Sequence, residues 1–418
     1  MLTLPSSASL LPQTTPVGRN LYVFPSQSTE LVKLDLIHEA GSAYQPQPLC
    51  ASAANHLFTV ASDTMDARQV AEFIDYRGIV IDHNPDILCA TTSIYFLRRY
   101  LDELLPVLHG LLDRPAFPQE HLTAFLNKRR QELQANSLKT REVARRIFYQ
   151  HLFGPEHPLG RYASPDDADR LDRDTVLRFF HEHYGSRTLI VSGNVDEQLL
   201  SSLSVVGSGK CVVDSSRQML STTHYPLSTA HSPLSVSIPG AVQTTLRVGR
   251  ILPLAWDDPD YAQFMLLTTL LGGYFGSRLM SNLREDKGFT YGIQAHTQIY
   301  RGVIVFYITA DLAASTVNSA EEEIRRELQR LCDEPVGDDE LSMVKTVLVG
   351  DFIRSVDGVF ERSERLRGML ATGVTETLTD NLRRALHEAT PDSLRSLAQQ
   401  FLAPGSMVYC RAGVCPSQ

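Results

Sequence analysis

Residues 283–292 read Leu-Arg-Glu-Asp-Lys-Gly-Phe-Thr-Tyr-Gly, and this stretch decides how the fold of the chain is interpreted. Residues 271–279 precede it and read Leu-Gly-Gly-Tyr-Phe-Gly-Ser-Arg-Leu, so that two adjacent glycines interrupt an apolar segment. A short helix is expected next, because Leu279, Met280 and Leu283 recur at a spacing that places them on one helical face.

The helix is expected to end at Gly288, because a lysine suits the negative end of the helix dipole and the glycine after it readily adopts a positive φ. Phe289, Tyr291 and Ile293 then alternate with polar or small residues, which predicts a strand. A helix that stops here and returns as a strand can bring Arg284 and Tyr291 side by side. The sequence therefore predicts a cation and a phenol at a helix–strand corner.

The simplest structural alternative is a surface arginine and a half-buried strand tyrosine. However, the run from Gly272 to Gly292 closely resembles a segment of the insulinase/pitrilysin family, which are zinc metallopeptidases of the inverted His-x-x-Glu-His type. In that family, an arginine and a tyrosine at this spacing bind substrate near the zinc. The resemblance implies the substrate-binding role for Arg284 and Tyr291 in this chain.

Composition and charge limit the other classes of function. The chain has 418 residues, 43% of them hydrophobic and 21% charged, as in an ordinary soluble globular protein, and its net charge of -9 gives a nucleic-acid role no electrostatic support. Its cysteines form no C-x-x-C pair and are expected to be mostly buried thiols: Cys50, Cys89, Cys211, Cys332, Cys410 and Cys415. No secretory signal or membrane helix is expected, so the predicted location is cytoplasmic, or periplasmic if a leader was removed.

The periodicity of apolar residues predicts an α+β order of elements. Strands are expected at 21–24, 31–38 and 188–193, a hairpin at 79–82 and 87–95 around Asn84-Pro85, and helices at 49–62, 67–76, 100–112, 118 to about 152, and 175–184.

The second half of the chain repeats this order. Residues 76–79 align with 286–289 and residues 111–115 with 331–335, at offsets of 210 and 220 residues. The repeat predicts two homologous domains, each a mostly antiparallel sheet backed by helices, at residues 1–205 and 233–418, with a linker at 206–232. The family resemblance adds that two such domains form half of a clamshell.

The zinc motif of the family is missing. Two histidines four residues apart share a helical face and can bind one ion, but no histidine in this chain has another four residues on. Ala54, Leu57 and Phe58 occupy the places of the motif's His, Glu and His, and Glu132 lies near the place of the third ligand. We expect Glu132 to be a solvated or ion-paired carboxylate, and we expect no metal in this chain.

A retained substrate-binding pair without a metal site resembles the non-catalytic subunit of bacterial two-subunit peptidases. The chain is then expected to be inactive alone, and to complete the site of a homologous zinc-bearing subunit that cleaves peptides. The alternative is a peptidase-like scaffold or peptide-binding protein with no proteolytic role. A homodimer of the isolated chain is a further expectation, whereas nucleic-acid and membrane partners are not. A hydrolase with another nucleophile has little support, because the sequence contains no G-x-S-x-G elbow.

Overall fold

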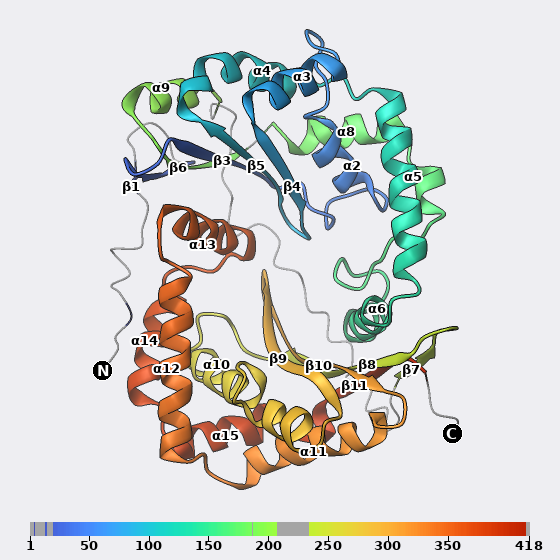
Figure 1. Ribbon diagram of the computed structural model, residues 1–418, viewed down its shortest axis with the longest axis vertical. Coiled ribbons are helices and arrows are strands. Elements are labelled where there is room, and N and C mark those ends of the chain that lie inside the picture. Colours follow the sequence, from blue (N-terminus) through green and yellow to red (C-terminus); the bar gives the residue numbers. More distant parts are fainter. Residues whose placement is uncertain (1–3, 5–12, 15–19, 186, 207–233, 415–418) are drawn as a thin grey trace.

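The computed structural model describes residues 4, 13–14, 20–185, 187–206 and 234–414, which form two α+β domains, one above the other in Figure 1. The first sheet has the strand order β1-β2-β6-β3-β5-β4 and the second the order β7-β11-β8-β10-β9. Each is antiparallel except for one parallel pair, β2 with β6 and β7 with β11. The expected fold class is therefore confirmed.

The bounds of the strands follow from the backbone pairing. In the first sheet they are β1 (Gln13–Thr14), β2 (Leu21–Pro25), β3 (Leu31–His38), β4 (Val80–Pro85), β5 (Ala90–Leu97) and β6 (Thr188–Gly193). In the second sheet they are β7 (Leu234–Ser237), β8 (Gln243–Leu252), β9 (Thr290–Tyr300), β10 (Val303–Ala313) and β11 (Val408–Gly413).

Helices cover both sheets. Those of the first half are α2 (Cys50–Leu57), α3 (Ala67–Arg77), α4 (Leu101–Asp113), α5 (Gln119–Asn136), α6 (Thr140–Phe153), α7 (Asp167–Arg170), α8 (Arg173–His183) and α9 (Glu197–Val206). Those of the second half are α10 (Pro259–Gly272), a π-helix η2 (Met280–Asp286), α11 (Val317–Asp333), α12 (Asp338–Arg354), α13 (Val359–Thr372), α14 (Thr377–Glu388) and α15 (Pro391–Phe401). Short 3₁₀ turns are η1 (Arg98–Tyr100) and η3 (Pro404–Ser406).

The internal repeat predicted from the sequence is present in the structure. Helices α12 and α13 begin 219 residues after α5 and α6, and β11 begins 220 residues after β6. The two corner glycines also correspond, because Gly78 (φ 61°) leads from α3 into β4 and Gly288 (φ 63°) leads from η2 into β9. Both have the left-handed backbone that favours glycine.

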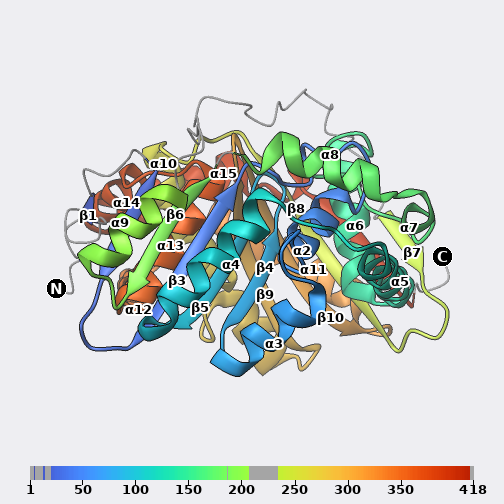
Figure 2. The same cartoon turned by 90° about the horizontal axis from the view of Figure 1, so that it is seen from above.

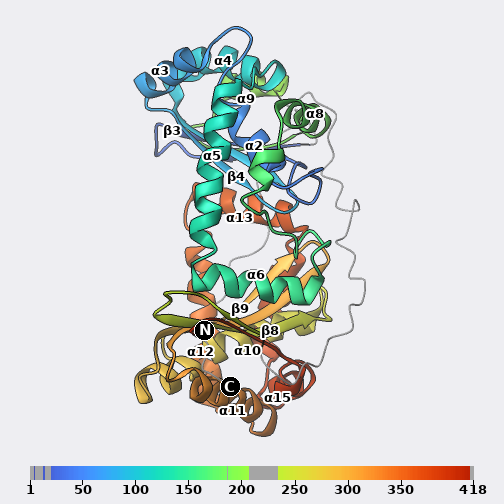
Figure 3. The same ribbon diagram turned by 90° about the vertical axis from the view of Figure 1, so that its right-hand side faces the viewer.

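The two domains exchange one helix each. Helix α6 belongs to the first half of the chain but packs on β8 and β11, and α13 belongs to the second half but packs on β2 and β6. Figure 3 shows α5 standing upright and leading to α6, which lies across the second sheet. Seen from above, α4 and α9 lie over the first sheet on its outer side (Figure 2). One apolar cluster, which includes Phe148 of α6 and Leu370 of α13, joins the domains.

Different interactions hold the two exchanged helices. Lys33 of β3 is 1% exposed and donates hydrogen bonds to Asp35, at 2.9 Å, and to Glu364 of α13. On the second sheet, the guanidinium of Arg247 lies 3.9 Å from the ring centre of Tyr307 and 5.3 Å from that of Phe148 on α6. A charge pair therefore links α13 to the first sheet, and a cation–π contact links α6 to the second.

Three expectations about local structure were wrong. The single helix predicted from residue 118 to about 152 is broken after Asn136, because the chain has to turn there to send α6 to the other sheet. The helix predicted at 49–62 ends at Leu57. The turn of the first hairpin lies at 86–89, where the amide of Asp86 donates to the carbonyl of Cys89, and Pro85 still belongs to the edge strand β4.

Some predictions fall partly outside the described residues. Of the six cysteines, Cys50, Cys89, Cys332 and Cys410 are buried as expected, whereas Cys211 and Cys415 lie outside the described residues. Almost all of the predicted linker, 206–232, also lies outside them. Among the helices that are described, none is both long and apolar enough to span a membrane.

Candidate functional site

The predicted helix–strand corner is formed by η2, Gly288 and the start of β9. As expected, Leu279, Met280 and Leu283 are buried on one face and anchor η2 in the core of the second domain. The amide of Gly288 donates to the carbonyl of Arg284 at 3.2 Å, and this bond closes the last turn. The chain then reverses and enters β9, which packs against η2.

Polar contacts with α11 and α12 also hold the corner in place. Asn282 of η2 donates to Glu327 of α11 at 2.7 Å, and Lys287 lies 3.2 Å from Glu323 of the same helix. Arg278, just before η2, forms two hydrogen bonds of 2.8 Å with the carboxylate of Glu340 on α12. These contacts fix the backbone from which Arg284 and Tyr291 project.

Tyr291 lies on the surface, with 92% of its side chain exposed, whereas Ile293 is fully buried. The expected alternation, with Phe289, Tyr291 and Ile293 on one face, is therefore wrong. Opposite β10, Thr290 pairs with Leu312 but Ile293 pairs with Ala310, so β9 contains one extra residue in this interval. This β-bulge reverses the direction of the side chains and turns the tyrosine outward.

Thr290 stabilises the bulge, since its hydroxyl donates to the carbonyl of Asp311 at 2.8 Å and accepts from the amide of Gly292 at 3.1 Å. A glycine within a strand pattern is a recognised signal for a bulge, so Gly292 is the residue from which the sequence could have predicted it. Bulges next to functional sites commonly redirect one side chain.

Arg284 is 37% exposed, and its Nε lies 3.3 Å from Oε1 of Glu285. Its guanidinium also lies 4.7 Å from the ring centre of Phe275, whose side chain is 61% exposed. The sequence interpretation did not identify Phe275, although an aromatic between glycines and near the corner was a usable signal. No hydrogen bond joins Arg284 to Tyr291 within the described ranges, so the two lie on adjacent elements without direct bonding.

The positions of the missing zinc motif lie on and just after α2, on its buried side. Ala54 and Phe58 have no exposed surface and Leu57 is 3% exposed. The ring of Phe58 lies 5.8 Å from that of Phe180 and 5.5 Å from that of Tyr184, both on or next to α8. Because these apolar side chains offer no lone pair, the residues at this site do not fit a zinc ion.

Glu132 is ion-paired, as expected. One of its carboxylate oxygens lies 2.7 Å from Arg129, one helical turn before it on α5, and both side chains are more than one third exposed. Across the described part of the chain, no three His, Cys, Asp or Glu side chains are grouped so that they could hold a metal ion.

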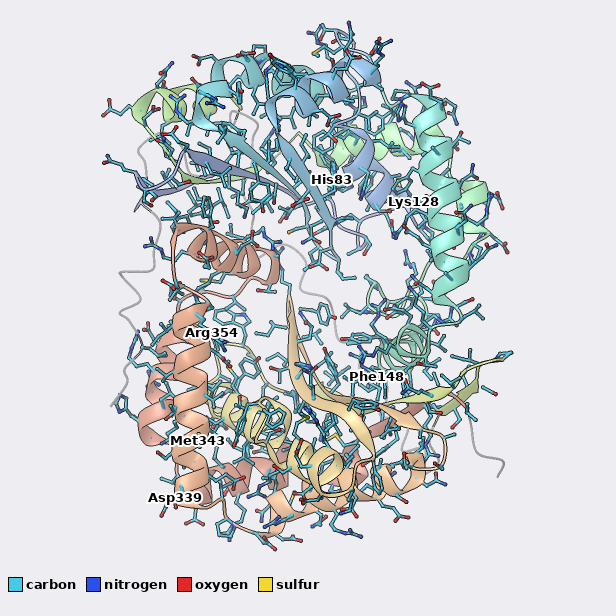
Figure 4. The ribbon with its side chains drawn as sticks, in the orientation of Figure 1. His83, Lys128, Phe148, Asp339, Met343 and Arg354 are labelled. Atoms are coloured by element: carbon cyan, nitrogen blue, oxygen red, sulfur yellow. The ribbon has the colours of Figure 1, made fainter. Side chains whose placement is uncertain are left out.

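Two histidines, His56 on α2 and His83 on β4, pack against each other. The rings of His56 and His83 stack with centres 4.7 Å apart, and His83 Nε2 lies 2.9 Å from the hydroxyl of Thr59. Burial, and to a smaller extent the neighbouring His56, lowers the pKa of His83 to about 3, so the ring is neutral near pH 7. In Figure 4, His83 lies beside α2 and Lys128 lies across from it on α5.

Comparisons with known proteins agree with this fold. Residues 170–348 match the family described as "Peptidase M16 inactive domain". Two curated bacterial relatives are described as uncharacterized zinc proteases: SCO5738 of Streptomyces coelicolor, 25% identical over 61% of this chain and 57% of that protein, and YmxG of Bacillus subtilis, 21% identical over 87% of each.

A solved structure of a peptidase M16 inactive domain from Pseudomonas fluorescens has the same fold, with a TM-score of 0.81. It is 21% identical in sequence, and the superposition covers 97% of this chain and 99% of that one. The resemblance predicted from residues 272–292 is confirmed: this chain is similar to peptidases of the M16 (insulinase/pitrilysin) family, residues 170–348 match the family's inactive domain, and the sequence lacks the inverted His-x-x-Glu-His motif.

Proposed function

We propose that this chain is the non-catalytic, substrate-binding subunit of a two-chain zinc metalloendopeptidase. A homologous partner would supply the metal and the attacking water. This chain would supply Arg284 and Tyr291, which hold the peptide and stabilise the charge that develops on the scissile carbonyl oxygen.

The observation that carries the proposal is the exposure of Tyr291. A tyrosine with 92% of its side chain in water contributes little to the core, yet a bulge and a network of hydrogen bonds hold its backbone in place. A structural role would favour a buried ring, as at Tyr184. The arrangement fits a phenol O–H that is kept free for a ligand.

The pairing of Arg284 with Glu285 does not argue against this role. The two side chains are 37% and 51% exposed, and ion pairs of that kind contribute between about 0 and 1 kcal/mol. A substrate carbonyl or carboxylate can therefore displace Glu285 at small cost, and the guanidinium offers several N–H donors.

Strand addition is the mode by which a peptide would reach the corner. Strand β9 lies at the edge of its sheet among the described strands, with its outer backbone groups unpaired by any of them. An extended peptide can add to such an edge through main-chain hydrogen bonds. The side chain of Tyr291 would then stand next to the added peptide.

The test is reconstitution. The gene next to this one is examined for a similar-sized product with His-x-x-Glu-His, and the two chains are co-expressed, purified together and assayed on a mixed peptide library. We expect no cleavage by this chain, little by the partner alone and strong cleavage by the mixture. If the zinc-bearing chain cleaves as fast alone as in the mixture, the alternative of a scaffold or peptide-binding protein replaces this proposal.

A further inference from the structure

A cavity of about 520 Å³ lies where α2, α5 and α6 meet, on the right of Figure 1. All of its lining residues lie between positions 42 and 165, so it shares none with the Arg284 and Tyr291 corner. Four segments of the chain form it, residues 42–52, 85–86, 129–150 and 161–165, and they include the break between α5 and α6 and part of the loop that follows α6.

Four arginines line this cavity, although the whole chain carries a net charge of -9. They are Arg129, Arg145, Arg146 and Arg161. The acidic residues of the lining are Asp86 and Glu142, which leaves an excess of positive charge at this place.

Two of the arginines are neutralised and two are not. Arg129 pairs with Glu132 at 2.7 Å and Arg145 with Glu142 at 2.8 Å. Among the described residues, the side chain of Arg146 forms no ion pair or hydrogen bond. The guanidinium of Arg161 donates, among them, only to the backbone carbonyl of Glu156, at 3.0 Å.

Further donors in the lining lack acceptors. The Nε of Arg129 is buried and has no hydrogen-bond partner among the described residues. Burial raises the pKa of Tyr162 to about 12, so its phenol stays protonated and can donate. Buried donors are normally paired, and an unpaired one is costly unless a ligand or water satisfies it.

The remaining wall is partly apolar, with Leu133, Val143 and Ile147 among its residues. A cavity with apolar walls and a few convergent polar groups is typical of a binding site for a small organic group. The arginine fork matches the geometry of a carboxylate, which it can bind through two parallel N–H donors.

We propose that this cavity binds a carboxylate group of the peptide substrate, either the C-terminal carboxylate or an Asp or Glu side chain, through Arg146 and Arg161. The chain would then select acidic peptides at a second point, apart from the corner at β9. This inference rests on the proposed function, because it assumes that peptides are the ligands of this subunit.

Four fluorescent decapeptides, identical except at two places, test it on the purified full chain by fluorescence anisotropy. They carry a central Glu or Gln and a free or amidated C-terminus. We expect the peptides with the relevant carboxylate to bind about tenfold more tightly than the neutral one, with the advantage reduced at 0.5 M NaCl by screening. Whichever of the two changes weakens binding identifies the source of the carboxylate.

Variants assign the effect to the cavity. Arg146→Gln with Arg161→Gln should abolish the tenfold advantage, and Arg146→Lys with Arg161→Lys should keep part of it. Arg68→Gln removes a charge from an exposed ion pair that is not part of the lining, and should change nothing. Because neither Arg146 nor Arg161 is ion-paired to a described residue, thermal melting should confirm that the double variants fold.

The outcomes separate this inference from the proposed function. Equal binding of all four peptides, unchanged in the double Gln variant, overturns the carboxylate site and leaves the proposed function standing. Displacement by inorganic phosphate without any preference for carboxylate peptides would identify a phosphate site instead and overturn the assignment. If none of the four peptides binds, both this inference and the role in substrate binding fail.

Discussion

The two places that matter most for function in this family have opposite surroundings in this chain. The face of α2 that corresponds to the zinc motif is fully buried and apolar, with Phe58 packed against Phe180 and Tyr184. The corner at η2 and β9 leaves Tyr291 92% exposed. The positions that align with the zinc motif therefore belong to the core of the first domain, whereas the corner leaves its tyrosine open to solvent.

The largest effect should come from restoring the motif on the buried face. The triple variant Ala54→His, Leu57→Glu and Phe58→His places polar groups in the core without partners, and we expect it to lose more than about 5 kcal/mol of unfolding free energy in EDTA. The single change Tyr291→His is the matched control at the exposed corner and should cost less than about 0.5 kcal/mol. Urea denaturation measures both, and a triple variant as stable as the parent would mean that this helix face is not core.

A smaller but specific effect is expected at the corner. Under the proposed function, Tyr291→Phe removes one donor aimed at the developing oxyanion, so kcat of the reconstituted two-chain enzyme should fall about a hundredfold, or about 3 kcal/mol. Complex formation and the melting temperature of this chain should stay unchanged, because the hydroxyl is exposed. If the assembled complex with Tyr291→Phe keeps the parental kcat, the hydroxyl of Tyr291 has no part in catalysis.

The pH dependence of stability tests the burial of His83 next to α2. The pKa of His83 is lowered to about 3 in the folded chain and is about 6.5 in an unfolded one. Between these values the unfolded state binds a proton that the folded state does not, so stability should fall as the pH falls through this window, by up to about 1.4 kcal/mol per unit.

Unfolding measured from pH 7 to pH 5 should therefore show a steeper loss for the parent than for His83→Asn. His121→Asn, at a more exposed histidine on α5, should keep the parental slope. If the unfolding free energy changes with pH at the same slope in all three proteins, the pKa of His83 is the same in the folded and unfolded states. That result would contradict the burial of His83.

The smallest of these effects should come from Arg284→Ala. Under the proposed function, the guanidinium of Arg284 binds the substrate at a point away from the reacting oxygen, so we expect kcat/KM to fall about tenfold, mainly through a higher KM. Arg284→Lys keeps the positive charge but not the planar set of N–H donors, so its kcat/KM should lie between those of the parent and Arg284→Ala. A fall in kcat alone, with KM unchanged, would contradict a role in binding.

Local signals in the sequence were sufficient for much of the fold. Glycine needs no neighbours to adopt positive φ, which is why Gly78 and Gly288 were recognisable as equivalent corners. Ala54, Leu57 and Phe58 could be assigned to the places of the zinc motif because that assignment depends only on spacing along the chain, and all three are buried. The absence of the zinc motif is also a matter of spacing alone.

The register of the strands and the packing of distant segments could not be predicted from these local signals. The alternation of Phe289, Tyr291 and Ile293 pointed to one shared face, but the pairing of β9 with β10 introduces a bulge that separates them. The break after Asn136 follows from the need of α6 to reach the opposite sheet, a contact between segments about 100 residues apart.

By itself, the sequence therefore determined the repeat, the corner glycines, the loss of the metal ligands and the identity of Arg284 and Tyr291 as candidates. Only the tertiary structure decided that Tyr291 faces solvent, that the domains exchange helices and that Arg146 and Arg161 line one cavity. The physical reason is the range of the interactions. Backbone preferences and spacing act within a few residues, whereas strand register and cavity walls depend on which distant segments come together.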